Sequence, residues 1–112
     1  MRTFLLVAML VALPMQVQAA FWPGDQLVGD MREYENPDAE GSSWYSAGAY
    51  MSYVMGAYDA YESAELICPP GNATAGQVNA VVAAYLKANP ADWHLAATTL
   101  VHAALKEAFP CG

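Results

Sequence analysis

Turns rich in proline and glycine divide the chain after residue 20 into short segments, and these breaks restrict the folds open to it. They are Pro23-Gly24, Asn36-Pro37, Cys68-Pro69-Pro70-Gly71 and Asn89-Pro90. Between the breaks, apolar residues recur with the period of an α-helix. Hairpin turns of the Asn-Gly or Asp-Gly type and alternating β-branched runs do not occur in the sequence. We therefore expect an all-α fold, a compact bundle of about four helices.

The first two expected helices run from Asp25 to about Glu35 and from about Trp44 to Leu66. The second is apolar over most of its circumference. One face holds Tyr50, Tyr53, Val54, Ala57, Tyr61 and Ala64, and it is extended by Met51, Met55 and Tyr58. A helix with so wide an apolar arc lies in the middle of a bundle or at a subunit contact.

The last two expected helices have explicit start signals. Thr74 with Gln77 three residues later predicts a capping box at the start of the third helix. Asn89 is expected to cap the fourth helix, with Pro90 at its first position and Pro110 at its end. The apolar stripe of the third helix comprises Val78, Val81, Val82, Tyr85 and Leu86. That of the fourth comprises Trp93, Ala97, Leu100, Val101, Ala104, Leu105 and Ala108.

The first 19 residues have the pattern of a signal peptide. Met1 and Arg2 provide a positive start, residues 3–13 form an apolar run, and Val17-Gln18-Ala19 is typical of a cleavage site. The run is shorter than the ~20 residues that a membrane-spanning helix needs. We expect cleavage after Ala19, no membrane insertion afterwards, and one exported domain of residues 20–112.

Acidic residues outnumber basic ones by 11 to 4, which gives a net charge of −7. Removal of the leader takes away Arg2 and no acid, so the charge becomes −8. This balance excludes nucleic acid as a partner, because phosphate binding needs a basic face. It favours a cationic protein partner, or serves solubility alone.

The two cysteines of an exported chain are most simply one disulfide, Cys68 to Cys111. The chain-entropy model gives it about 4 kcal/mol for a loop of this length. His94 and His102 lack the i, i+4 spacing of a helical metal pair. Asp59, inside the second helix with Gly56 and Ser63 about one turn away, is expected to make a buried structural hydrogen bond. We expect no metal, no cofactor and no enzymatic activity.

The segment before the second helix is acidic and rich in turn residues, and we expect an exposed loop there. Tyr34, Trp44 and Tyr45 flank it. Aromatic residues beside an exposed loop are typical binding anchors, or they pack the loop onto the bundle. The composition and these aromatics indicate a protein-binding module and nothing more specific.

The order of residues adds a family resemblance. Residues 53–60 (YVMGAYDA), Cys68-Pro69, residues 74–77 (TAGQ), residues 81–86 (VVAAYL) and residues 103–111 (AALKEAFPC) resemble the Rap/Tai family of immunity proteins. Its structural motif here comprises Gly56, Asp59, Thr74 and Gln77. The resemblance spans residues 50–111. This chain departs from the family pattern in one respect. Many relatives have a further pair of cysteines in the first third of the chain, and this sequence has none. Tyr50 stands near the position of one of these cysteines, and Ser52 stands at the position of a glycine that follows it.

The resemblance implies a small periplasmic α-helical protein, often dimeric, that neutralises type VI secretion effectors, notably peptidoglycan amidases, through a loop in the catalytic cleft. The leading hypothesis is therefore a toxin inhibitor whose contact residues are Glu35, Asp38, Glu40, Ser42, Ser43 and Trp44. The alternative is an exported envelope-assembly module that dimerises through the Tyr and Met face of the second helix. A third hypothesis, an enzyme using Asp59 or His94, has no supporting constellation of groups.

Overall fold

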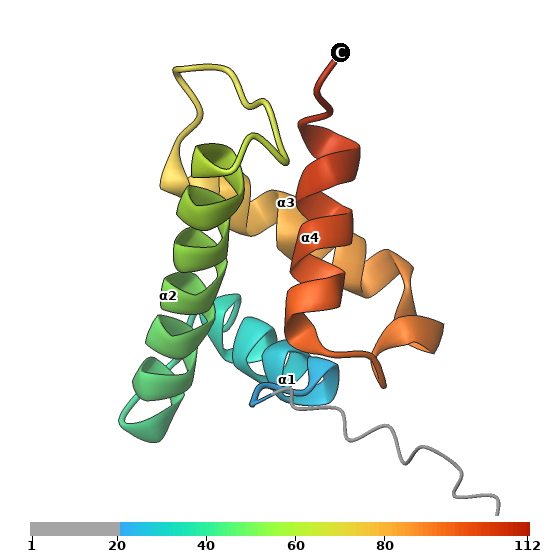
Figure 1. Ribbon diagram of the computed structural model, residues 1–112. Coiled ribbons are helices and arrows are strands. Elements are labelled where there is room, and N and C mark those ends of the chain that lie inside the picture. The colour runs from blue at the N-terminus through green and yellow to red at the C-terminus, as the bar shows by residue number, and fades with distance from the viewer. Residues whose placement is uncertain (1–20) are drawn as a thin grey trace, which may run out of the picture.

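The computed structural model describes residues 21–112, in which every regular element is helical. The predicted leader, with its cleavage site after Ala19, lies outside the described residues. The elements in chain order are α1 (Gly24–Tyr34), α2 (Ser42–Ser63), α3 (Ala75–Ala88), the short 3-10 helix η1 (Pro90–Asp92) and α4 (Ala97–Ala108). In Figure 1, α2 and α4 stand upright and α1 and α3 lie across them. The expected all-α bundle is confirmed. None of the described helices is long and apolar enough to cross a membrane.

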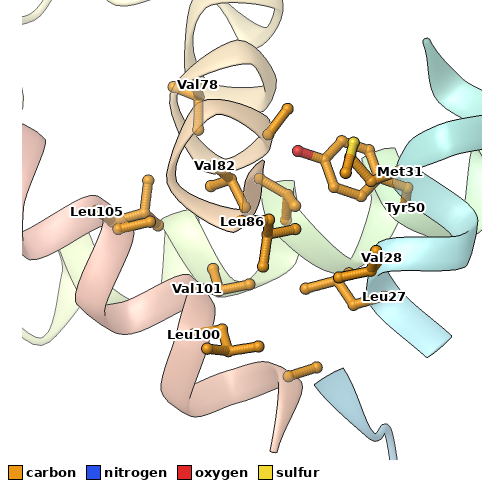
Figure 2. Packing of buried hydrophobic residues seen from close by; sticks show 14 of the residues in the cluster. Leu27, Val28, Met31, Tyr50, Val78, Val82, Leu86, Leu100, Val101 and Leu105 are labelled. Carbon is orange, nitrogen blue, oxygen red and sulfur yellow. The ribbon is translucent and has the colours of Figure 1, made fainter. Parts of the chain in front are cut away.

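One hydrophobic core lies between the four helices (Figure 2). It draws on one face of each of α1, α3 and α4. For α3 and α4 this face is the apolar stripe that periodicity predicts, except that Ala108 is exposed. Its fully buried aliphatic side chains include Leu27, Val28, Met31, Val78, Val82, Leu86, Leu100, Val101 and Leu105.

Helix α2 contributes less to this core than its apolar sequence predicts. Only Tyr50 and Val54 are buried among its residues, whereas Met51 is 41% exposed. A position in the middle of the bundle is therefore wrong for α2, which lies at the edge. The alternative prediction, that α2 lies at a subunit contact, stays a prediction, because the structure holds a single chain.

Helix α2 also ends earlier than predicted, at Ser63 rather than Leu66. The next residues fold into a Schellman turn, in which Glu65 N–H donates to the carbonyl of Glu62 and Leu66 N–H to that of Tyr61. Glu65 adopts the left-handed conformation that this turn requires, with φ of 58°. Glycine usually takes this position, so the sequence carried no sign of the turn.

The predicted start of α3 is confirmed and that of α4 is wrong. Thr74 and Gln77 form the full capping box, with a distance of 3.2 Å from Gln77 N to Thr74 Oγ1. Asn89, however, closes α3 by donating from Nδ2 to the carbonyl of Tyr85. Pro90 opens only the 3-10 turn, and α4 begins at Ala97.

The α3–α4 connection is held by contacts from distant parts of the chain. The Trp93 indole donates to the carbonyl of Leu86 at 2.7 Å. Gly24 N–H donates to the carbonyl of Leu95, and Ala97 N–H donates to that of Trp22. These bonds fix residues 93–96 outside a helix, which explains why α4 starts late.

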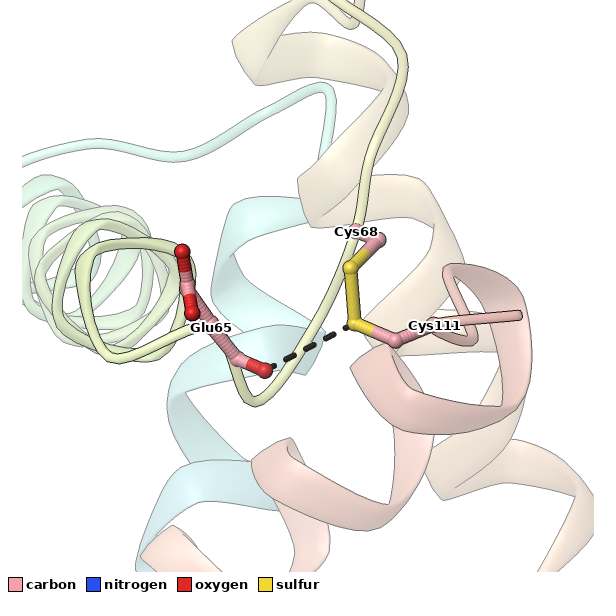
Figure 3. Close-up of a disulfide and its surroundings, with 3 residues drawn as sticks. All are labelled: Glu65, Cys68 and Cys111. Atoms are coloured by element: carbon pink, nitrogen blue, oxygen red, sulfur yellow. Dashed lines mark hydrogen bonds between the residues drawn. A yellow bond between two sulfur atoms is a disulfide. The ribbon is translucent and has the colours of Figure 1, made fainter.

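The Cys68–Cys111 disulfide is confirmed and joins the segment after α2 to the end of the chain (Figure 3). Its Cα atoms are 4.9 Å apart, and Cys68 N–H donates to the carbonyl of Phe109 beside it. Cys111 Sγ also lies 3.6 Å from the carbonyl oxygen of Glu65. Because a disulfide sulfur carries no hydrogen, this is a close contact and not a hydrogen bond.

Candidate protein-binding surface

The connection between α1 and α2 carries the acidic residues that the sequence predicted as a contact surface. Asp38 and Glu40 are exposed there. The connection is ordered by its own hydrogen bonds: Asn36 Oδ1 accepts from Asp38 N–H, and Ala39 N–H donates to the Asn36 carbonyl. Glu35 is already engaged, because its carboxylate pairs with Lys87 at 2.8 Å. The structure thus leaves Asp38 and Glu40 as the outward-facing charges of this connection.

Three of the predicted loop residues lie in a helix. Ser42, Ser43 and Trp44 form the first turn of α2, which begins two residues before the predicted start at Trp44. Gly41 precedes them with φ of 56°, a conformation that glycine adopts without strain. The acidic loop is therefore shorter than predicted, and residues 42–44 present their side chains from a helix rather than a flexible segment.

The aromatic residues beside the loop divide into two roles. Tyr34 packs against buried Tyr50, with ring centroids 5.0 Å apart, so it fixes the loop to the bundle. Trp44 and Tyr45 are 71% and 79% exposed. The packing alternative is therefore confirmed for Tyr34, whereas a role of Trp44 and Tyr45 as binding anchors stays a prediction. Trp44 also joins the two parts, because its indole Nε1 donates to the carbonyl of Ala39 in the acidic loop.

Trp44 and Tyr45 border an open depression of about 560 Å³ between the first half of α2 and Trp22, which precedes α1. Its lining residues are Trp22, Trp44, Tyr45, Gly48, Ala49, Ser52 and Tyr53. Trp22 stacks against Tyr53 with ring centroids 5.5 Å apart. Trp22 could not be predicted from the sequence as part of this surface, because it is placed by a backbone bridge between Pro23 and Ala96, which are far apart in the chain. The one local sign in the sequence is that Trp22 precedes the Pro23-Gly24 break. That sign does not indicate that the chain here lies beside Ala96.

A buried carboxylate lies beside this depression. Asp30 on α1 is 9% exposed, and neither its Oδ2 nor the indole Nε1 of Trp22 has a hydrogen-bond partner of standard geometry among the described residues. Burial raises the pKa of the Asp30 carboxyl, and the nearby Ser46 hydroxyl and Trp22 indole partly oppose this rise. The interface of α1 with α2 therefore has an incompletely satisfied polar site behind its exposed aromatic residues.

The described basic side chains lie away from the depression. Arg32 stacks over the ring of Trp93, with its guanidinium carbon 5.2 Å from the ring centroid. Lys87 pairs with Glu35, and Lys106 borders a separate hollow with His102. The surface formed by the acidic loop and the first half of α2 therefore combines exposed aromatic rings with negative charge.

The other candidate residues lie elsewhere and are not brought together. Asp59 and Gly56 are exposed on α2, so the expected buried hydrogen bond of Asp59 is wrong. His94 is exposed, with Nδ1 3.0 Å from the Ala91 carbonyl, whereas His102 packs against Tyr61. Within residues 21–112 no three His, Cys, Asp or Glu side chains are placed to hold a metal ion.

A family model described as Rap1a immunity proteins matches residues 24–111. The chain belongs to this family. The match spans all four helices, both cysteines and the acidic connection, and thus extends the resemblance seen from residue 50 onward. No curated protein matched the chain in a sequence comparison. Membership of the Rap1a immunity family implies a non-catalytic inhibitor whose partner is a protein toxin.

Proposed function

We propose that the protein is exported to the periplasm and neutralises a type VI secretion effector by binding it and covering its active site. A peptidoglycan amidase is the effector class that we propose, in line with the family resemblance. The contact surface in this proposal comprises Asp38 and Glu40 with the first turn of α2. Glu35 is assigned to positioning this loop through its ion pair with Lys87.

One observation carries this proposal: two largely exposed aromatic residues, Trp44 and Tyr45, lie close to two exposed carboxylates, Asp38 and Glu40, that pair with no basic side chain among the described residues. Trp44 and Tyr45 are the most exposed of the large apolar side chains after Phe21. Aromatic residues of this kind are frequent energetic centres of protein interfaces. Asp38 and Glu40 would draw a basic toxin surface toward them and increase the association rate.

The experiment is periplasmic co-expression of the chain with the effectors encoded near its gene. The wild-type chain is expected to rescue growth from one of them. The variant Asp38→Asn/Glu40→Gln should slow association with that effector by about tenfold at low salt, since steering is electrostatic. The control Asp59→Asn/Glu107→Gln removes the same charge from other exposed positions and should keep the wild-type rate. Absence of rescue from every neighbouring effector would refute the proposal.

A second candidate function is an exported envelope-assembly module that pairs with another copy of the chain. It is favoured by α2, where residues 42–58 carry no charged side chain and Met51 is exposed. Pull-down from envelope extracts tests it. Recovery of an endogenous envelope complex, with no toxin and with a homodimer that Met51→Lys dissociates, would support this candidate over the inhibitor.

A further inference from the structure

The depression between the first half of α2 and Trp22 has apolar walls that the fold leaves open to water. Trp22 and Tyr53 stack on each other at one wall, and Trp44 and Tyr45 stand exposed at another. Exposed tryptophan and tyrosine side chains such as these are frequent energetic centres of protein interfaces. None of the seven lining residues is charged, so the depression itself offers apolar contact and aromatic ring faces.

The floor of the depression is made of small side chains, which creates its space. Gly48, Ala49 and Ser52 occupy it. A Cβ atom built on Gly48 meets no heavy atom within 4 Å, so the space above this glycine is empty. The volume of about 560 Å³ is enough for one large side chain and part of its flanking backbone.

The charges beside the depression all have one sign. Trp44 links its wall to the acidic loop, because the indole donates to the Ala39 carbonyl between Asp38 and Glu40. The one ion pair among residues 21–112 is Lys87–Glu35, so neither of these two carboxylates is neutralised by a neighbouring base. A ligand in the depression therefore meets apolar walls and, at the Trp44 side, uncompensated negative charge.

We infer that this depression binds one large apolar side chain of the toxin, presented next to a lysine or arginine that faces Asp38 and Glu40. The inference rests on the proposed function and specifies the chemistry of its partner. The apolar side chain displaces water from Trp44, Tyr45 and Tyr53, which gives the contact its stability. The cation contacts the carboxylates and the ring faces of the exposed aromatic residues, which gives it selectivity.

Small probes that carry the two chemistries test the inference without the toxin. Tryptamine has an indole ring and a cation, and indole-3-propionate has the same ring and an anion. Each is titrated into the uniformly 15N-labelled domain, with amide and indole shifts followed by NMR. We expect tryptamine to shift residues of the depression and the indole of Trp44. Indole-3-propionate should bind about fivefold more weakly, the size expected for a single screened charge contact.

Two leucine substitutions provide the matched variants. Gly48→Leu adds a large side chain at the floor of the depression, at a position where the Cβ has open space, and it should abolish the tryptamine shifts. Gly29→Leu makes the same change at an exposed helical glycine of α1 whose Cβ also meets nothing within 4 Å, and it should leave binding unchanged. Both variants should keep the wild-type pattern of core methyl signals. Asp38→Asn/Glu40→Gln should bring the two probes to equal affinity.

The same variants then connect the depression to the toxin. With the effector identified by the rescue assay, Gly48→Leu should weaken binding at least tenfold and Gly29→Leu should not. Equal binding of the two probes to the wild type, or tryptamine binding that survives Gly48→Leu, would overturn the inference. Shifts of the same residues on dilution of the free protein would also overturn it, because the occupant would then be a second copy. Failure of rescue with normal tryptamine binding would reject the proposed function and the toxin as partner, but not the ligand chemistry of the depression.

Discussion

The two ends of α2 differ in how completely the fold uses them. At the C-terminal end, a Schellman turn, the disulfide and the Cys68–Phe109 backbone bond tie the chain to α4. At the N-terminal end, residues 42–49 bury none of their side chains fully, and two aromatic rings face water. Both ends are helical and rich in aromatic residues. The difference shows that apolar composition alone does not distinguish a segment that stabilises the fold from one that is available to a partner.

The largest effect is expected at the tied end, from removal of the disulfide. Cys68→Ser/Cys111→Ser should lower the free energy of unfolding by about 4 kcal/mol, because the unfolded chain regains the entropy of an open loop. Urea denaturation followed by far-UV circular dichroism measures this loss. Reduction of the wild type should reproduce it, whereas a loss of less than about 1 kcal/mol would show that the hydrogen bonds hold this end by themselves.

A second large effect is expected where the chain after residue 20 joins the α3–α4 connection. A Cβ on Gly24 would lie 2.5 Å from the carbonyl oxygens of both Leu95 and Trp93. Since backbone atoms must shift to make room, Gly24→Ala should destabilise the protein by about 1–3 kcal/mol. Gly29→Ala, at an unobstructed helical position, should instead stabilise it by up to about 1 kcal/mol. Equal thermal denaturation of the two variants would contradict the packing of this bridge.

The Schellman turn gives a smaller effect in the opposite direction. Glu65→Gly should raise the free energy of unfolding by about 0.5–1 kcal/mol, because glycine adopts the left-handed conformation without the steric cost paid by glutamate. Glu65→Ala removes the same charge and keeps that cost, so it should not stabilise. A gain in both variants would point to charge rather than backbone conformation.

The buried carboxylate at the interface of α1 and α2 gives a pH-dependent effect. The pKa of the Asp30 carboxyl is raised in the folded protein relative to the unfolded chain. The contribution of this group to the stability of the fold is therefore fully present below the pKa of the unfolded chain, and it is lost as the pH rises through the pKa of the folded protein. The free energy of unfolding of Asp30→Asn, relative to that of the wild type, should therefore increase between the pKa of the unfolded chain and that of the folded protein, and then level off. Urea denaturation across acidic to neutral pH measures it, and parallel profiles of the two proteins would contradict the assignment.

The smallest effect on stability is expected at the open end. Tyr45→Ser should change the free energy of unfolding by no more than about 0.5 kcal/mol, because the side chain is 79% exposed. The same substitution should weaken effector binding measurably by calorimetry if this end is the contact surface. A large loss of stability would show that Tyr45 stabilises the fold. The N-terminal end of α2 would then not differ from the C-terminal end in this respect.

The helices of the bundle were predictable where local signals were strong. The α3 capping box depends on two residues three apart, and the stripes of α3 and α4 follow from periodicity, so both could be recognised. The end of α2 and the start of α4 could not, because a glutamate takes the position usual for glycine and Trp93 binds back to α3. The candidate surface could be predicted only in part. Asp38, Glu40 and Trp44 could be named from the sequence, but Trp22 and the depression could not.

The sequence by itself determined the all-α class, the disulfide pairing and the separation of the helices, because breaks, caps and a single pair of cysteines act locally or leave no alternative. Only the tertiary structure decided which aromatic residues are used by the fold. Tyr50 is buried and Tyr45 is exposed, although both lie in residues 42–58 of α2, which carry no charged side chain. The physical reason is that burial depends on what packs against each side of α2, and the neighbours α1, α3 and α4 cover one side and leave the other to solvent.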